Sequence, residues 1–125
     1  MEKIFLLIME NNITLELYKE AGYKIRIFSE NILILVNRQN EFLEYVNINL
    51  LENNLEALFK YIWPKCIKRY PDLNYSLMYN NEEKLFSSTI TIKNFIDDTD
   101  YLISNVSYIS MYNSFCFCIL RLLKL

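Results

Sequence analysis

The distribution of hydrophobic and polar positions over the first half of the chain predicts β-strands. Residues Lys3–Met9 form a continuous apolar run, which is typical of a strand buried on both faces. Further strands are predicted, from alternation or from aliphatic clusters, at Ile13–Tyr18, Tyr23–Phe28, Asn31–Val36 and Phe42–Ile48. The connections are too short for a parallel crossover, so consecutive strands must pair antiparallel. The first half is therefore predicted to be a meander of about five strands.

Tight turns in such a meander need residues with positive φ, which glycine normally supplies. The chain has only one glycine, Gly22. Asparagine is the next most tolerant residue in this conformation. Asparagines stand where turns are expected, at Asn11, Asn12, Asn40, Asn80 and Asn81. We interpret them as substitutes for glycine.

The clearest helical pattern begins near Leu50. Asn49 is a suitable N-cap, and Glu52 three residues later completes a pair resembling a capping box. Apolar residues then recur at helical spacing, at Leu51, Leu55, Leu58, Phe59 and Ile62. Pro64 disfavours helical geometry at Trp63, so the helix is expected to stop or kink there, near residue 63.

The second half predicts a hairpin followed by a helix. Leu73–Tyr79 and Leu85–Ile92 have strand patterns, and residues 80–83 would join them. From Thr99 onward, apolar residues follow a spacing of three and four, and Thr99 or Asp98 could cap a helix. Phe115–Ile119 would also suit a strand. The sequence therefore leaves three interpretations of residues 101–125: a core helix, a strand, or an element that contacts a partner.

These elements define an α+β fold in a single domain, residues 1–125. An antiparallel β-meander is followed by a helix near 50–63, a second hairpin and a C-terminal helix. A chain of 125 residues is long enough to bury one core. We find no internal sequence repeat.

Composition excludes several kinds of chemistry. The chain has no histidine, which excludes Ser-His-Asp and Cys-His catalysis and histidine-ligated metals. A single glycine excludes a glycine-rich phosphate loop. The net charge is −2, so nucleic acid is not an expected partner. We expect no cofactor and no enzymatic activity. The excess of Asn, Ile, Lys, Tyr and Phe follows AT-rich codons and points to an AT-rich source such as a phage or virus.

The cysteines and the longest uncharged segment bear on location. Cys66, Cys116 and Cys118 are odd in number, which favours reduced core thiols and a cytoplasmic protein, in the host cytoplasm if the source is viral. Tyr101–Leu120 carries no charge and is long enough to span a bilayer. Its many serines, asparagines and tyrosines make it too polar for a typical spanning helix, so membrane insertion is not expected.

Three clusters could carry chemistry, and each has a structural alternative. A basic and aromatic group could stack on single-stranded nucleic acid or contact an acidic protein, or it could simply end a helix. Its members are Lys60, Tyr61, Trp63, Lys65, Lys68, Arg69 and Tyr70. The acidic run Asp97–Asp100 could bind Mg²⁺, or it could cap a helix. Cys116 and Cys118 lack the further ligands that zinc needs, so a buried apolar strip is favoured.

The ten tyrosines favour a protein that works by contact, because tyrosine is enriched at interfaces. We hypothesise a non-enzymatic protein-binding module, an inhibitor or regulator of the viral counter-defence or immunity type, acting on a protein such as a nuclease or toxin. It would use a sheet edge or a tyrosine-rich acidic surface. The candidate contact residues are Glu41, Glu44, Tyr45, Tyr75, Tyr79, Glu82, Glu83, Asp97 and Asp98. The alternative is an accessory subunit of a larger assembly that uses residues 101–125 as its contact element. Homo-oligomers are compatible with both.

Overall fold

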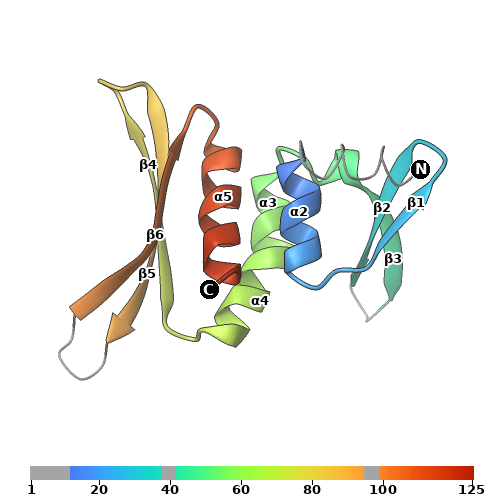
Figure 1. Cartoon of the computed structure of the whole chain (residues 1–125), viewed down its shortest axis with the longest axis horizontal. Coiled ribbons are helices and arrows are strands. Elements are labelled where there is room, and N and C mark those ends of the chain that lie inside the picture. Colours follow the sequence, from blue (N-terminus) through green and yellow to red (C-terminus); the bar gives the residue numbers. More distant parts are fainter. Residues whose placement is uncertain (1–11, 38–41, 95–98) are drawn as a thin grey trace. The chain divides into compact units, whose positions relative to one another are not determined.

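The computed structural model describes residues 12–37, 42–94 and 99–125, which form two compact units. Unit 1 comprises Met1–Ile62 and unit 2 comprises Trp63–Leu125, and each is described by itself. Each contains one three-stranded antiparallel sheet together with helices (Figure 1). The predicted α+β class, with a β-meander and a C-terminal helix, is confirmed. The single domain over residues 1–125 stays a prediction.

In unit 1, three strands pair in their order along the chain. Its elements are α2 (Ile13–Glu20), β1 (Ile25–Phe28), β2 (Asn31–Asn37), β3 (Leu43–Asn47), the 3₁₀ turn η2 (Ile48–Leu50), α3 (Leu55–Ala57) and the π-helical turn η3 (Leu58–Ile62). The strands predicted at 23–28, 31–36 and 42–48 are therefore present. The strand predicted at Lys3–Met9 lies outside the described residues.

The strand predicted at Ile13–Tyr18 is wrong, because this segment forms helix α2. Asn12 is its N-cap, and the Asn12 side-chain oxygen accepts a hydrogen bond from Leu15 N at 3.1 Å. The buried residues are Thr14, Leu15, Leu17 and Tyr18, which lie on one side of a helix at the spacing of three and four. The apparent alternation of 13, 15 and 17 overlaps this pattern, and tertiary burial decides between them.

The helix predicted near 50–63 begins at Leu55 instead, and helical backbone continues to Arg69. Asn54 is the N-cap of α3 in place of Asn49, and its side chain accepts a hydrogen bond from Ala57 N at 3.1 Å. The helical backbone does not stop at Trp63, because α4 (Trp63–Arg69) follows directly and contains Pro64. Proline lacks an N–H and its ring conflicts with the carbonyl four residues earlier, here that of Lys60. The wider π turn at Leu58–Ile62 accommodates that missing bond.

The interpretation of the asparagines as positive-φ residues is wrong at Asn12, Asn80 and Asn81. Among the described residues, positive φ occurs at Gly22, Ser29, Asn53 and Lys84. The asparagines act through their side chains instead. Asn80 Oδ1 accepts hydrogen bonds from the main-chain N–H groups of Glu82 and Glu83 in the turn between β4 and β5. Asn11 and Asn40 lie outside the described residues.

Unit 2 repeats the order of unit 1, a helix, three antiparallel strands and a helix. After α4 come β4 (Leu73–Asn80), β5 (Leu85–Asn94), β6 (Thr99–Tyr108) and α5 (Met111–Leu123). The predicted hairpin is present, with its turn at residues 81–84. The helix predicted from Thr99 is wrong over its first part: residues 99–108 form β6, which pairs with β5. The helix begins at Met111 after the N-cap Ser110, whose side chain accepts from Asn113 N.

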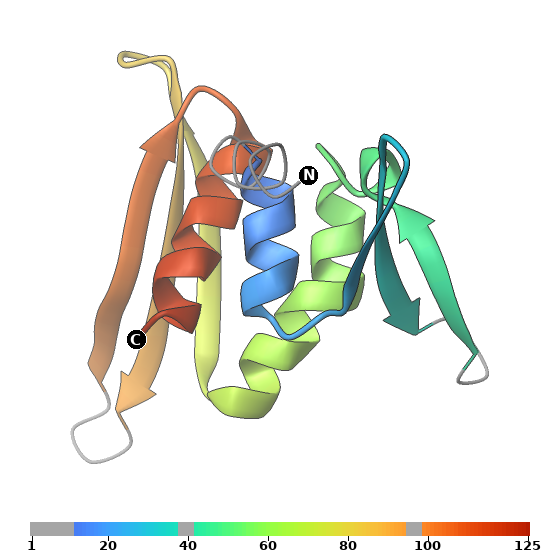
Figure 2. The same ribbon diagram turned by 45° about the vertical axis from the view of Figure 1, so that its right-hand side comes forward.

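Helix α5 covers one face of the second sheet (Figures 1 and 2). Phe115, Cys116 and Ile119 are fully buried in this layer, and the alternative strand at Phe115–Ile119 is not formed. Two buried serines link the layers. Ser114 Oγ donates to Val106 O at 2.9 Å and lies 2.5 Å from Ser88 Oγ. The core of unit 2 therefore lies between α5 and the sheet.

Candidate protein-binding surfaces

Within the described residues of unit 1, helices cover one face of the first sheet and leave the other face uncovered. Ile32, Ile34 and Val36 of β2 are buried, so their face is the inner one. Figure 1 shows α2 and α3 on one side of this sheet, with no other described element of unit 1 on the opposite side. The strand register places on that opposite side Lys24, Arg26, Phe28, Asn31, Leu33, Leu35, Asn37, Leu43, Tyr45 and Asn47. We call these residues the outer face.

The outer face has an apolar centre and a basic side. Phe28 is 63% exposed, Leu43 67% and Tyr45 40%, and Leu33 and Leu35 are half-buried between them. None of the ten side chains is acidic, and the two cations are Arg26 in β1 and Lys24 directly before that strand. Contiguous exposed apolar side chains on a soluble unit mark a site of interaction.

Sequence reasoning identified only Tyr45 of this outer face. Phe28 and Leu43 were missed, because exposure depends on which side of the sheet the helices cover. One signal was present: β2 is aliphatic at consecutive positions, which indicates apolar side chains on both faces of the strand.

The predicted tyrosines of unit 2 lie on β4, on the side that faces α5. The Tyr75 ring contacts Trp63 at 5.2 Å and Phe115 at 5.6 Å between centroids, and the Tyr79 ring contacts Phe86 at 4.8 Å. Both tyrosines keep almost half of their surface exposed. They therefore border the core and contribute to the surface at once.

The predicted carboxylates fall into separate groups. Glu82 and Glu83 are exposed in the turn between β4 and β5 of unit 2. Glu44 is exposed on β3 of unit 1, on the opposite side of the strand from Tyr45. Glu41, Asp97 and Asp98 lie outside the described residues. The described candidate contact residues therefore do not form one surface: they belong to two units, and within unit 1 Glu44 and Tyr45 lie on opposite sides of β3.

The basic and aromatic cluster has structural roles at two of its members. Trp63 is only 7% exposed, because its ring packs against Tyr75 and Phe115. Arg69 donates from Nη1 to Leu123 O at 3.1 Å, at the C-terminal end of α5, where a cation is favourable. Lys65 and Lys68 are exposed on α4, and Lys60 Nζ lies 5.4 Å from the Tyr61 ring centroid. Trp63 therefore offers no face for stacking on a base.

The three cysteines are buried and unpaired by disulfides. Burial raises the pKa of the Cys66 thiol to about 11 and that of Cys116 to about 12. Both thiols are therefore protonated at neutral pH and are weak nucleophiles. Within the described ranges, no three His, Cys, Asp or Glu side chains gather as metal ligands would.

None of the helices in residues 12–37, 42–94 and 99–125 is long and apolar enough to cross a membrane. The second half of Tyr101–Leu120 belongs to α5, whose side chains pack on the sheet of unit 2.

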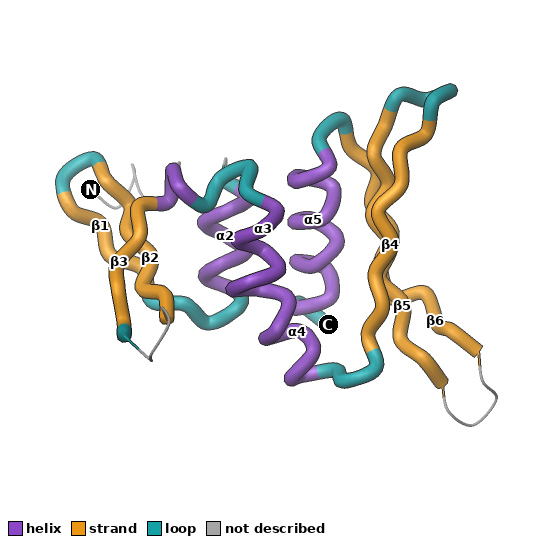
Figure 3. The backbone as a smooth tube through the Cα atoms, turned by 180° about the vertical axis from the view of Figure 1, so that it is seen from behind, coloured by secondary structure: helices purple, strands orange, loops and turns teal. Residues whose placement is uncertain are grey.

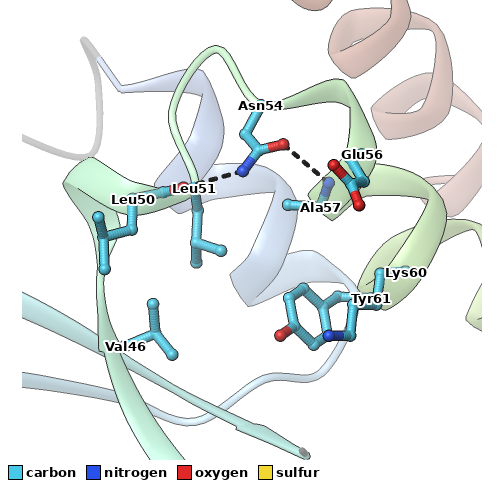
Figure 4. A pocket seen from close by; sticks show the side chains of 8 residues that line it. All are labelled: Val46, Leu50, Leu51, Asn54, Glu56, Ala57, Lys60 and Tyr61. Atoms are coloured by element: carbon cyan, nitrogen blue, oxygen red, sulfur yellow. Dashed lines mark hydrogen bonds between the residues drawn. The ribbon is translucent and has the colours of Figure 1, made fainter.

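A pocket of about 340 Å³ opens in unit 1 beside α3 (Figure 4). Asn54 links two other lining residues, because its Nδ2 donates to Leu50 O at 3.2 Å and its Oδ1 accepts from Ala57 N. Apolar side chains, charged side chains and Tyr61 line it together: Val46, Leu50, Leu51, Asn54, Glu56, Ala57, Lys60 and Tyr61. Its aliphatic lining side chains suit an apolar group, and Glu56 and Lys60 offer one charge of each sign.

Compared with protein-family models, with curated proteins and with solved structures, the chain gives no match.

Proposed function

We propose that this chain is a non-enzymatic protein-binding module and that the outer face of unit 1 is its contact surface. The observation that carries the proposal is the exposure of Phe28, Leu43 and Tyr45 together on one uncovered sheet face. Phe28 and Leu43 lie at opposite ends of the face, and Leu33 and Leu35 connect them. Exposed aromatic and aliphatic side chains with polar neighbours are typical of protein interfaces.

The charges of the outer face indicate the chemistry of its partner. Lys24 and Arg26 flank the apolar centre on the β1 side, and the face has no carboxylate to neutralise them. A partner with an apolar surface next to carboxylates is complementary to this arrangement. The inhibitor or regulator role, of the viral counter-defence or immunity type, is a finer proposal that rests on size, charge and composition.

The alternative function, with residues 101–125 as a contact element, receives less support. Their described part is the paired strand β6 and then α5, in which Phe115, Cys116, Cys118 and Ile119 are fully buried. Those four side chains form the core of unit 2, so the surface that this segment could offer a partner is limited to exposed residues such as Leu102 and Ile109.

The test is a capture experiment with matched variants. Wild type, Leu43→Lys and Leu102→Lys are immobilised and exposed to an extract of the cells that express the chain. Leu102, in β6 of unit 2, is 62% exposed, close to the 67% of Leu43, so it is a control for an exposed leucine outside the outer face.

We expect one protein to be captured by wild type and by Leu102→Lys but not by Leu43→Lys, and to form a complex of defined stoichiometry when purified. Arg26→Glu should weaken the same complex, because it reverses a charge beside the apolar centre. If every captured protein is retained equally by Leu43→Lys, the outer face is not the contact surface and the proposal fails.

A further inference from the structure

Strand β4 lies at the edge of the second sheet, and no other described strand pairs with its outer side (Figure 3). The hydrogen bond from Lys93 N to Asp72 O fixes which residues face inward, because hydrogen-bonded pairs alternate along an antiparallel ladder. Even-numbered residues of β4 therefore direct their main-chain groups toward β5. Leu73, Tyr75, Leu77 and Tyr79 direct theirs away from the sheet.

This edge lacks the features that usually prevent a strand from pairing with another chain. Such features are charged side chains, prolines and bulges. In eight residues, β4 has no charge and no proline, and its register with β5 is unbroken. The other edge strand, β6, has a bulge at Ile103, because Ile90 pairs with Ser104 but Thr91 pairs with Leu102.

We propose that β4 pairs antiparallel with β4 of a second copy of this chain, so that two sheets join into one of six strands. Residues whose main-chain groups point away from β5 must pair with the same kind of residue in the second copy. One register brings all four of these residues into the ladder. In it, Leu73 pairs with Tyr79 of the second copy, and Tyr75 pairs with Leu77 of the second copy. The twofold axis then passes between the two copies of Ser76, which lie directly opposite one another.

The charges at the two ends of β4 favour a second copy as the occupant. In this arrangement the turn Asn81–Lys84, which follows β4 of each copy, is at the same end of the strand pair as the segment Lys68–Asp72, which ends α4 and precedes β4 of the other copy. The turn contains two carboxylates and one ammonium, for a net charge of −1. The segment contains Lys68, Arg69 and one carboxylate, for a net charge of +1. The two copies therefore attract each other electrostatically at both ends of the strand pair, since a twofold axis makes the two ends identical.

A single strand pair buries less surface than a standard interface, so the dimer is weak, with a Kd in about the micromolar to hundred-micromolar range. Strand β4 shares no residue with the outer face of unit 1. The dimer therefore stands or falls independently of the function proposed above.

The experiment is sedimentation velocity over protein concentrations from about 5 to 500 µM, a range that covers weak interfaces. Wild type should shift from monomer to dimer as its concentration rises. Ser76→Lys and Ser76→Glu each place like charges face to face in the dimer only, and each should weaken it by at least about tenfold. An equimolar mixture of these two variants should dimerise again.

Ser107→Lys is the matched control, since Ser107 is also an exposed serine, on the other edge strand of the same sheet. It should dimerise like wild type. Circular dichroism checks that each variant is folded. The proposal is overturned if wild type stays monomeric throughout the range, or if the mixture of Ser76 variants does not re-associate. It is also overturned if Leu43→Lys or Ser107→Lys dissociates a dimer that Ser76→Lys leaves intact.

Discussion

The paired hydroxyls between α5 and the second sheet allow a quantitative test of the core. Ser88 and Ser114 are both fully buried, and Ser114 Oγ donates its proton to Val106 O. The proton in the contact between the two hydroxyls must therefore come from Ser88. Ser114→Ala removes the acceptor of Ser88 and leaves that hydroxyl buried without it.

The direction of the hydrogen bond between the two serines sets the expected loss of stability for each variant. An unsatisfied buried donor costs about 1–3 kcal/mol, and a lost hydrogen bond about 1 kcal/mol more. Ser114→Ala should therefore lower the free energy of unfolding by about 2–4 kcal/mol. Ser88→Ala should cost only about 1 kcal/mol, because Ser114 keeps its bond to Val106. The double variant should cost about 2 kcal/mol, less than the sum of the two single changes.

Urea unfolding followed by circular dichroism measures these differences, and a change of 2 kcal/mol moves the midpoint by about 1 M. Ser107→Ala, at an exposed serine of β6, should change the stability by less than about 0.5 kcal/mol. Equal costs for the two single variants, or strict additivity in the double variant, would refute the assigned direction of the hydrogen bond.

Two further predictions concern the backbone and pH. Gly22 has φ +95° with open space where a Cβ would lie, so Gly22→Ala should destabilise by about 1–2 kcal/mol through backbone strain alone; an unchanged urea midpoint would contradict this. Burial raises the pKa of Tyr23 to about 12, and those of Cys66 and Cys116 to about 11 and about 12, from ordinary values of 10.0 and 9.0. These groups are neutral in the folded state, so stability should be constant below pH 9 and fall as pH rises toward 12. Unfolding free energies from pH 7 to pH 11 test it, and a flat profile would contradict the burial of these groups.

The candidate surfaces were predictable only in part. Tyr75, Tyr79, Glu82 and Glu83 could be placed on a hairpin from local pattern, and the structure has that hairpin. The packing of Tyr75 against Trp63 and Phe115 could not be predicted, because those two residues lie outside the hairpin and are distant in sequence from Tyr75. The outer face escaped prediction for the same kind of reason, since a side chain on a strand is exposed only if no other layer covers it.

Local pattern by itself determined the antiparallel strands of both hairpins and the presence of a helix near the C-terminus. Alternation and short connections act over a few residues, so the sequence contains all the information needed. Tertiary structure alone decided two segments, Ile13–Glu20 and Thr99–Tyr108. The pattern of the first fits a strand and a helix almost equally, and burial of one helical side selects the helix. The second becomes a strand because β5 supplies nine residues that pair with its main chain, a gain that no residue near it in sequence can offer.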